Sequence, residues 1–335
     1  MKKGVSVVIC CYNSASRLPE TLGHLRNQRV PTDLNWEVVL VDNNSSDNTA
    51  QAAHQLWDSY LTDIPLRVVN EPNQGLIHAR MTGVREARYE YLIFCDDDNW
   101  LCNSYITDSY RIMESNDLIG ACGGRGAPVF GGEKPTFFDG CVHGYALGPQ
   151  GRAEGQVIGN TLYGAGLVVR RSVILRVLDS GFQTRLSGRS GKSLSAGDDG
   201  ELTTLIKILG YQLWYSPYLE FEHYLPEGRL QWSYITRMFR QFGKGNGVLQ
   251  PYYALAERTN ERSWTYHFLR RIYYTLRRLT APTTIREKYI ILLMDATMLT
   301  TMVSQRKYFG STMQDLLRVK ENYRALTPQA ILNRP

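Results

Sequence analysis

The stretch FCDDDNW, residues Phe94 to Trp100, places three consecutive carboxylates at the end of an apolar segment of β type. Asp96, Asp97 and Asp98 would repel one another unless a cation lies among them. With the alternation of a strand, Asp96 and Asp98 point to one side and Asp97 to the other. Such a pair suits one Mg²⁺ or Mn²⁺ ion, because these hard ions prefer oxygen ligands and bridge to phosphates. The triplet suits an acidic loop or a helix N-terminus equally well, since Asp is common at both.

The segments before the triplet favour the first interpretation. Two apolar β-branched runs, Gly4–Asn13 and Trp36–Ala50, each change from a strand pattern to a helix start. PLRVVNEPNQ adds a third strand, Gly75–Ala87 a helix, and the fourth strand ends at the triplet. Strands that alternate with helices in this way predict an α/β fold with a mostly parallel sheet flanked by helices on both faces. Ligands bind such sheets beyond the carboxyl ends of the strands. The polar strand tips gathered there are Asn13, Asp42, Glu71 and Asp96 to Asp98.

The order and spacing of these motifs resemble the family 2 glycosyltransferases of the GT-A fold. VVICCYN, VVLVDNNSSDNT, NQGLIHAR and FCDDD follow one another as in that family, and GAGLVVRRSVI and GDDGELTTLIKILGY come after them. The resemblance covers about residues 4 to 245. It implies a GT-A type α/β domain whose parallel sheet binds a nucleotide, and an inverting transfer of sugar from a nucleotide-sugar donor. One departure concerns Asp198, which stands where the family usually has Glu before Asp199.

The resemblance also implies which residues bind the donor and its ion. Asp42 would accept hydrogen bonds from the base or ribose, and Arg80 would donate to the base or diphosphate. The alternatives are helix capping by Asp42 and a surface ion pair for Arg80. The metal ligands would be Asp96, Asp98 and His223, holding Mn²⁺ or Mg²⁺ as Lewis acid and template; His223 is equally well explained as a structural residue. The complete donor-binding set is Tyr12, Asn13, Asp42, Asn44, Asn73, Gly75, Arg80, Asp96 and Asp97.

The catalytic base is expected in SAGDDGEL, where a Gly-rich loop precedes an amphipathic helix. Inverting transfer needs a group that takes the proton of the acceptor hydroxyl. The resemblance assigns this role to Asp199, with Asp198 beside it. A helix N-terminus lowers the pKa of a carboxyl and so weakens a base, and Asp198 would have to oppose that effect. Simple helix capping by Asp198 or Asp199 is the alternative.

Charge divides the chain into two predicted parts. Residues 1–225, the expected catalytic domain, carry 20 basic and 25 acidic side chains, and residues 226–335 carry 18 and 7. The second part contains two basic amphipathic segments, RLQWSYITRMFRQFGKG and TYHFLRRIYYTLRRL, and an apolar stretch, Tyr289–Val303, that includes Asp295. These features predict a helical appendage that binds an anionic membrane surface, or that packs on the catalytic domain or on a second copy in a homodimer. No nucleic-acid-binding motif is present, so no nucleic-acid partner is expected.

The remaining features limit the class of protein to which the chain can belong. The N-terminus turns polar after seven apolar residues, so we expect a cytoplasmic protein, peripheral at the inner face of the membrane. Six cysteines without C-x-x-C spacing are expected to be reduced. The predicted function is transfer of a sugar, from a UDP-sugar, to a hydroxyl of a glycan or lipid-linked acceptor in cell-surface polysaccharide or glycolipid synthesis. Two alternatives are a sugar-nucleotidyl transferase, for which CCYNSASRL lacks a Gly-rich basic phosphate loop, and a non-catalytic glycan-binding or scaffold subunit.

Overall fold

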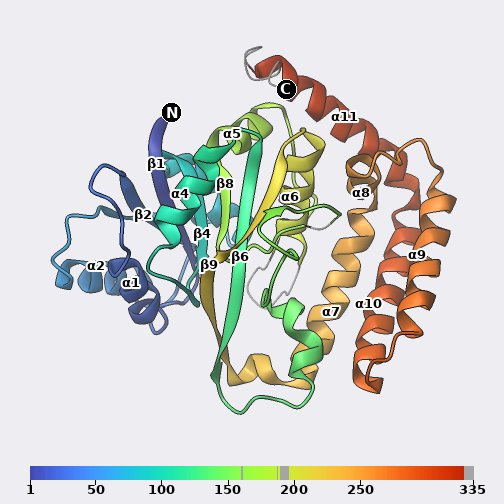
Figure 1. Ribbon diagram of the computed structural model, residues 1–335, viewed down its shortest axis with the longest axis horizontal. Coiled ribbons are helices and arrows are strands. Elements are labelled where there is room, and N and C mark those ends of the chain that lie inside the picture. The colour runs from blue at the N-terminus through green and yellow to red at the C-terminus, as the bar shows by residue number, and fades with distance from the viewer. Residues whose placement is uncertain (160, 187, 189–195, 328–335) are drawn as a thin grey trace.

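The computed structural model describes residues 1–159, 161–186, 188 and 196–327, and shows an α/β core with helices packed along one side (Figure 1). The strands are β1 Lys2–Cys11, β2 Trp36–Asp42, β3 Leu66–Asn70, β4 Tyr89–Asp96, β5 Asn99–Leu101, β6 Ile119–Gly131, β7 Gly155–Gln156, β8 Leu167–Arg170 and β9 Gln212–Pro226. The helices are α1 Leu18–Arg26, α2 Thr49–Ser59, α3 Leu76–Glu86, α4 Tyr105–Ser115, α5 Arg171–Asp179, α6 Asp198–Ile208, α7 Trp232–Val248, α8 Gln250–Ala256, α9 Trp264–Leu279, α10 Ile285–Ser304 and α11 Phe309–Leu326. Three short 3₁₀ segments are η1 Phe138–Tyr145, η2 Glu227–Leu230 and η3 Arg306–Tyr308.

The strands form one sheet in the order β3-β2-β1-β4-β8-β6-β9-β5, and β7 pairs with β9. The first four strands in this order are parallel, as the alternation of strands and helices predicts. β8 then runs antiparallel to both β4 and β6, so the sheet is mixed beyond β4. Because β1 lies between β2 and β4, Cys11 pairs with Asp42 and Cys10 with Asp96, which brings these strand ends to one edge. The predicted α/β fold class is confirmed.

Burial on both faces explains why the first strands read as continuous apolar runs. In β1, Val8 packs into the core on one face of the sheet, and Val7 and Ile9 pack into the core on the other. Helices α1, α2 and α4 lie against one face and α3, α5 and α6 against the other (Figure 1). All six cysteines are free thiols, as the spacing predicts.

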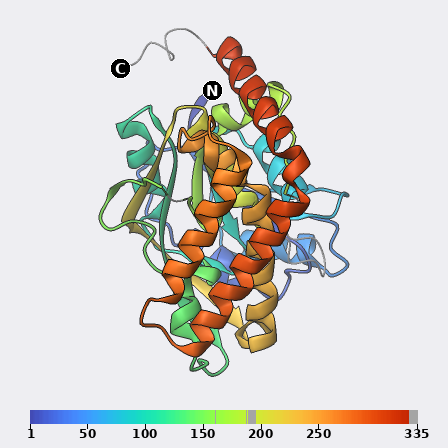
Figure 2. The ribbon, with the colours of Figure 1, turned by 90° about the vertical axis from the view of Figure 1, so that its right-hand side faces the viewer.

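Close backbone packing joins two of the C-terminal helices, α7 and α10. A Cβ on Gly243 of α7 would lie 2.3 Å from the carbonyl oxygen of Met294 in α10, and one on Gly247 would lie 2.6 Å from Thr301. Glycine therefore allows α7 and α10 to approach closely. The apolar stretch that includes Asp295 is thus a helix in a bundle, and Figure 2 shows α9 and α10 side by side on the outer face of that bundle. Among the described residues, no helix is both long and apolar enough to cross a membrane.

The two predicted amphipathic segments differ in what covers them. Ile235 and Met238 of α7 are buried in a cluster with η1 and η2, so this helix packs on the protein as the alternative interpretation proposed. In α9, Leu269, Tyr273 and Leu276 are each more than half exposed. The hypothesis of membrane binding therefore no longer applies to α7 but still applies to α9.

Candidate active site

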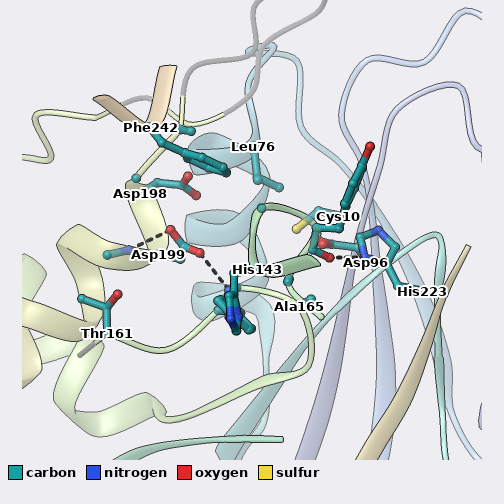
Figure 3. A pocket seen from close by; sticks show the side chains of 18 of the residues that line it. Cys10, Leu76, Asp96, His143, Thr161, Ala165, Asp198, Asp199, His223 and Phe242 are labelled. Atoms are coloured by element: carbon teal, nitrogen blue, oxygen red, sulfur yellow. Dashed lines mark hydrogen bonds between the residues drawn. The ribbon is translucent and has the colours of Figure 1, made fainter. Parts of the chain in front are cut away.

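A cavity of about 760 Å³ opens at the carboxyl ends of β1 and β4, between α3, α6, α7 and α10. It brings together many of the predicted site residues from segments far apart in the chain. Figure 3 shows Asp198 and Asp199 on one side of this cavity and Asp96 and His223 on the other. The predicted residues that line it are Tyr12, Gly75, Arg80, Asp96, Asp97, Asp98, Asp198, Asp199 and His223.

The acidic triplet does not continue the strand. β4 ends at Asp96, and Asp97 and Asp98 form the turn that leads into β5. The predicted alternation of the three side chains is therefore wrong, because it requires extended backbone. Asp96 keeps a third of its side chain exposed, at 34%, and the side chain of Asp98 is only 4% exposed. Each carboxylate consequently has different partners.

Asp97 turns back toward α1. Its Oδ2 accepts a hydrogen bond from Nη2 of Arg17 at 2.6 Å and another from the hydroxyl of Ser14. Burial and the adjacent Asp98 raise the pKa of Asp97, and Arg17 and Ser14 act in the opposite direction. The prediction from sequence assigned no role to Arg17. Its presence in the cavity lining shows that a basic residue does follow the first strand, although no Gly-rich loop accompanies it.

Asp98 faces a second arginine and His223. Nη1 of Arg229 lies 2.8 Å from Oδ2 of Asp98, and Nε2 of His223 lies 3.5 Å from Oδ1. The register of β5 on β9 creates this contact, because Asn99 pairs with His223 and so places Asp98 beside it. Burial would lower the pKa of Arg229, but Asp98 and neighbouring acidic groups raise it overall. The other nitrogen of His223, Nδ1, lies 2.8 Å from the carbonyl oxygen of Tyr145, which fixes the ring.

The two carboxylates of α6 are held differently. Nη1 of Arg80 lies 2.5 Å from Oδ2 of Asp198, whereas Nη2 of Arg80 lies 4.0 Å from Asp96 across the cavity. Asp199 accepts hydrogen bonds from the backbone N–H groups of Gly164, at 3.0 Å, and Gly200, at 2.8 Å. The bond from Gly200 lies in the first turn of α6, so Asp199 also satisfies a free N–H of the helix N-terminus, and capping stays open beside catalysis.

The surroundings of Asp199 favour its protonated form. Burial, followed by the neighbouring charge of Asp198, raises the pKa of Asp199. Arg80 and the two backbone N–H groups oppose that rise without cancelling it. The effect expected from the helix N-terminus is thus outweighed by desolvation. Burial and the charge of Asp199 also raise the pKa of Tyr163 to about 12, so its hydroxyl stays protonated.

The remaining predicted donor-binding residues shape loops beside the cavity. Asn13 and Asn44 both adopt left-handed backbone conformations, and Asn13 accepts a hydrogen bond from the N–H of Ser46. Oδ1 of Asp42 accepts from the N–H of Ser45. These three residues and Asn73 lie outside the described lining of the cavity, and their contact with a donor stays a prediction.

Asn43 is a lining residue that sequence reasoning missed. Its side-chain N–H₂ donates to the carbonyl oxygens of Glu71 and Asn73, and its Oδ1 accepts from the N–H of Gly75 at 2.7 Å. It thereby fixes the loop that leads into α3. Its only signal in the sequence is its place directly after Asp42 at a strand tip.

The C-terminal helices complete the cavity with an apolar wall. Phe239 and Phe242 of α7 contact each other edge to face, with ring centroids 5.6 Å apart, and both line the cavity. Ile291 and Met294 of α10 add aliphatic surface beside them. The acidic clusters and this wall therefore belong to one site, to which residues on both sides of position 225 contribute.

The geometry of the cavity bears on whether its residues could hold the predicted metal ion. Within the ranges that the structure describes, no three His, Cys, Asp or Glu side chains are grouped so as to hold a metal. Mg²⁺ and related ions are commonly held by one or two carboxylates together with substrate phosphates rather than by a cage of protein ligands. Of the predicted ligands, Asp98 and His223 lie 3.5 Å apart and Arg229 contacts both, so a metal at Asp96, Asp98 and His223 stays a prediction.

Comparison with known proteins shows what the N-terminal part of the chain is similar to. Residues 6–137 match the model of Glycosyl transferase family 2. The poly(ribitol-phosphate) beta-glucosyltransferase of Bacillus spizizenii is 28% identical over 131 residues, which are 37% of this chain and 20% of that protein. The UDP-Glc:alpha-D-GlcNAc-diphosphoundecaprenol beta-1,3-glucosyltransferase WfgD of Escherichia coli is 27% identical over 131 residues, 35% of this chain and 49% of that protein. This N-terminal part therefore matches glycosyltransferase family 2, as its motifs predict.

Both matches span less than half of the relative's own length. Similarity of structure extends further. The mannosyltransferase PcManGT from Pyrobaculum calidifontis, solved in complex with GDP-Man and Mn²⁺, matches over 97% of this chain and 87% of its own, with a TM-score of 0.54 and 18% sequence identity. At this identity the likeness concerns the fold alone, and it confirms the GT-A type α/β architecture with C-terminal helices.

Proposed function

We propose that this chain transfers a sugar from a UDP-sugar to a hydroxyl of a glycan or lipid-linked acceptor, with inversion at the anomeric carbon. The observation that carries the proposal is the pairing of two acidic clusters across one cavity. The triplet Asp96 to Asp98 stands at the strand ends where GT-A folds bind nucleotides, and Asp199 faces the same space from α6. Residues 1–225 would supply the base and most of the donor site, and residues 226–335 would add Arg229 and the apolar wall.

In the proposed reaction Asp199 acts as the general base. The acceptor hydroxyl attacks the anomeric carbon from the face opposite the diphosphate, and its proton passes to the carboxylate of Asp199. A new carbon–oxygen bond forms as the bond to the leaving phosphate oxygen breaks. The backbone N–H groups of Gly164 and Gly200 hold the carboxylate in place, and its raised pKa makes it a stronger base than an exposed Asp.

The leaving diphosphate would lie against the triplet. Arg17 and Arg229 are positioned beside Asp97 and Asp98, where they can donate to phosphate oxygens. Asp96, Asp98 and His223 would hold a Mn²⁺ or Mg²⁺ ion that enters with the nucleotide. When bound, the ion neutralises charge on the diphosphate. Displacement of Arg229 from Asp98 toward the phosphates would open that position.

The relatives support the choice of substrates. WfgD is named for a UDP-Glc donor and a diphosphoundecaprenol-linked sugar acceptor, and the Bacillus enzyme is named for poly(ribitol-phosphate). We therefore include cell-surface polysaccharide or glycolipid synthesis at the cytoplasmic face of the membrane in the proposal. GDP-Man in the structural relative shows that a similar fold also accepts another nucleotide, so both nucleotides belong in the test.

The test measures melting temperature with UDP, GDP and their sugars, each in Mn²⁺, in Mg²⁺ and in EDTA. A ligand that binds the folded state raises the melting temperature by linkage, so UDP should stabilise the protein only with a divalent ion present. Asp98→Ala should abolish this gain. Equal stabilisation in EDTA would refute the metal site, and no stabilisation by any nucleotide would refute the donor site.

Product analysis separates the alternative functions. A glycosyltransferase releases UDP from a UDP-sugar, whereas a sugar-nucleotidyl transferase releases pyrophosphate from UTP and a sugar phosphate. A non-catalytic glycan-binding subunit would show neither product. Incubation with each substrate pair, followed by measurement of UDP and pyrophosphate, distinguishes the three.

A further inference from the structure

We propose that the outer face of α9 and α10 is a docking surface for an anionic lipid bilayer. Tyr266, Leu269, Tyr273 and Leu276 recur at helical spacing on α9 and are between 42% and 60% exposed. On α10 a second exposed row follows the same spacing: Ile285, Tyr289, Leu292 and Val303. The two helices lie side by side on one face of the molecule, so the rows belong to one surface (Figure 2). Apolar rows of this extent on a water-exposed helix pair indicate an interaction surface.

The charge of this surface selects the partner. Within α9 and α10 six side chains are basic and two are acidic. Asp295 is fully buried against Arg278 and Thr275, and Glu287 caps the start of α10. Arg270 pairs with Glu257 and Arg271 donates to Gln250, so the outward positive charge comes mainly from the remaining basic side chains. Arg277 is exposed beside the apolar row of α9. Exposed Leu and Tyr next to Arg are typical of helices that lie in a membrane interface, where the apolar side chains enter the lipid and the basic ones contact anionic headgroups.

The inner side of the same helices explains what docking would achieve. Ile291 and Met294 of α10 line the active-site cavity, whereas Tyr289 and Leu292 face outward. A helix with its side chains is about 10 Å thick. A bilayer on the outer face would therefore lie within about one helix diameter of the cavity wall. This step rests on the proposed function: it assigns the site to an acceptor whose sugar is attached to a membrane lipid.

Flotation of the full chain with vesicles tests the surface directly. We expect binding to vesicles of phosphatidylcholine with phosphatidylglycerol at low salt, and weaker binding in high salt because salt screens the headgroup attraction. The double variant Leu269→Gln/Leu276→Gln should lower the partition coefficient by at least about tenfold, because two apolar side chains no longer enter the lipid. Arg277→Gln should lower it by about fivefold on anionic vesicles.

Matched exposed positions elsewhere serve as controls. Leu61, which follows α2, is 93% exposed and Tyr218 is 66% exposed, and α2 lies at the opposite side of the molecule from α9 (Figure 1). The double variant Leu61→Gln/Tyr218→Gln should bind vesicles like the wild type. All variants should keep the nucleotide-dependent rise in melting temperature without vesicles, which separates this proposal from the donor site.

Two results would overturn the docking surface. One is a full chain that ignores anionic vesicles at low salt, whether or not light scattering shows a dimer; a dimer would assign the apolar rows to contact between two copies. The other is equal vesicle binding by the wild type and Leu269→Gln/Leu276→Gln. Failure of nucleotide stabilisation with intact vesicle binding would refute the donor site and leave the docking surface standing.

Discussion

The cavity contains two acidic clusters whose negative charges are compensated by different partners. In the first, Asp97 pairs with Arg17 and Asp98 with Arg229, so each inner carboxylate has its own guanidinium. In the second, Arg80 contacts Asp198 directly, and Asp199 is held by backbone N–H groups. Burial and Asp98 raise the pKa of Asp97, and the ion pair with Arg17 opposes that rise. The carboxylate of Asp199 is held by uncharged N–H donors, so its protonation breaks no direct ion pair.

This difference indicates that the two clusters have separate functions. The first suits the fixed charges of a leaving diphosphate, because its arginines and carboxylates can exchange partners when phosphate arrives. The second suits proton transfer, because burial and Asp198 raise the pKa of Asp199. Variants that change one cluster and leave the other intact test this comparison.

The largest effect is expected at Asp199. Asp199→Asn keeps the size of the side chain but cannot accept a proton, so transfer should fall by about 10² to 10⁴. Nucleotide binding, followed by melting temperature with Mn²⁺, should stay close to that of the wild type. Asp198→Asn is the matched control on the same helix and should have the milder effect on turnover. A larger loss with Asp198→Asn would exchange the roles of the two acids.

A smaller but measurable effect is expected on stability when Arg229 is replaced. Arg229→Gln removes the guanidinium from a carboxylate whose side chain is 4% exposed, which should cost about 3 kcal/mol. Arg17→Gln is the control in the same cluster. It should cost about 1 kcal/mol, because Asp97 keeps its hydrogen bond from Ser14 and its side chain is 12% exposed. Urea unfolding with a constant m value measures both, and equal losses would show that the two pairs are equivalent.

The first cluster could be predicted from the sequence because each of its strands and the polar residues at its end are adjacent in the chain. Each strand of the parallel half is a short apolar run that ends in a polar tip, and parallel strands necessarily bring those tips to one edge. The fold class, the triplet and Arg80 follow from that rule together with the family resemblance. The partners of the triplet do not, because Arg17 reaches Asp97 across 80 residues and Arg229 reaches Asp98 only through the pairing of β5 with β9.

The C-terminal part was harder to predict for a related reason. A row of Ile, Met and Phe at helical spacing looks the same whether it faces lipid, a partner or the protein's own core. In α7 the glycines decide the outcome, because Gly243 and Gly247 bring α10 close enough for α7 to be covered. The spacing of glycines within a basic helix was not interpreted as a contact, so the apolar wall of the cavity was missed.

Arg80 connects the two clusters, and a conservative change there should have an intermediate effect on turnover. Its planar fork reaches Asp198 at 2.5 Å and Asp96 at 4.0 Å, and its guanidinium lies 5.4 Å from the ring centre of Phe94. Lysine keeps the charge but presents a single point, so Arg80→Lys should lower kcat/KM by about tenfold. Arg67→Lys is the matched control: Arg67 also bridges two carboxylates, Glu37 and Glu86, away from the cavity. Loss of activity with both variants would indicate a general effect of stability.

The smallest expected effect is a displaced acid limb in the pH profile, and its sign follows from Asp199. Because the pKa of Asp199 is raised above the ordinary value of 3.8, the base is still protonated at pH values where an exposed Asp is ionised. Activity should therefore begin to fall at a higher pH than an ordinary carboxyl predicts.

The folded state also binds this proton more tightly than the unfolded state does, so the contribution of Asp199 to stability is lost as the pH rises through the raised pKa. Asp199→Asn removes this dependence and should become more stable relative to the wild type as the pH rises from 3.8 through the raised pKa. Melting temperatures of the two proteins above pH 3.8 measure the difference, and a gap that does not widen as the pH rises would mean that the pKa of Asp199 is not raised.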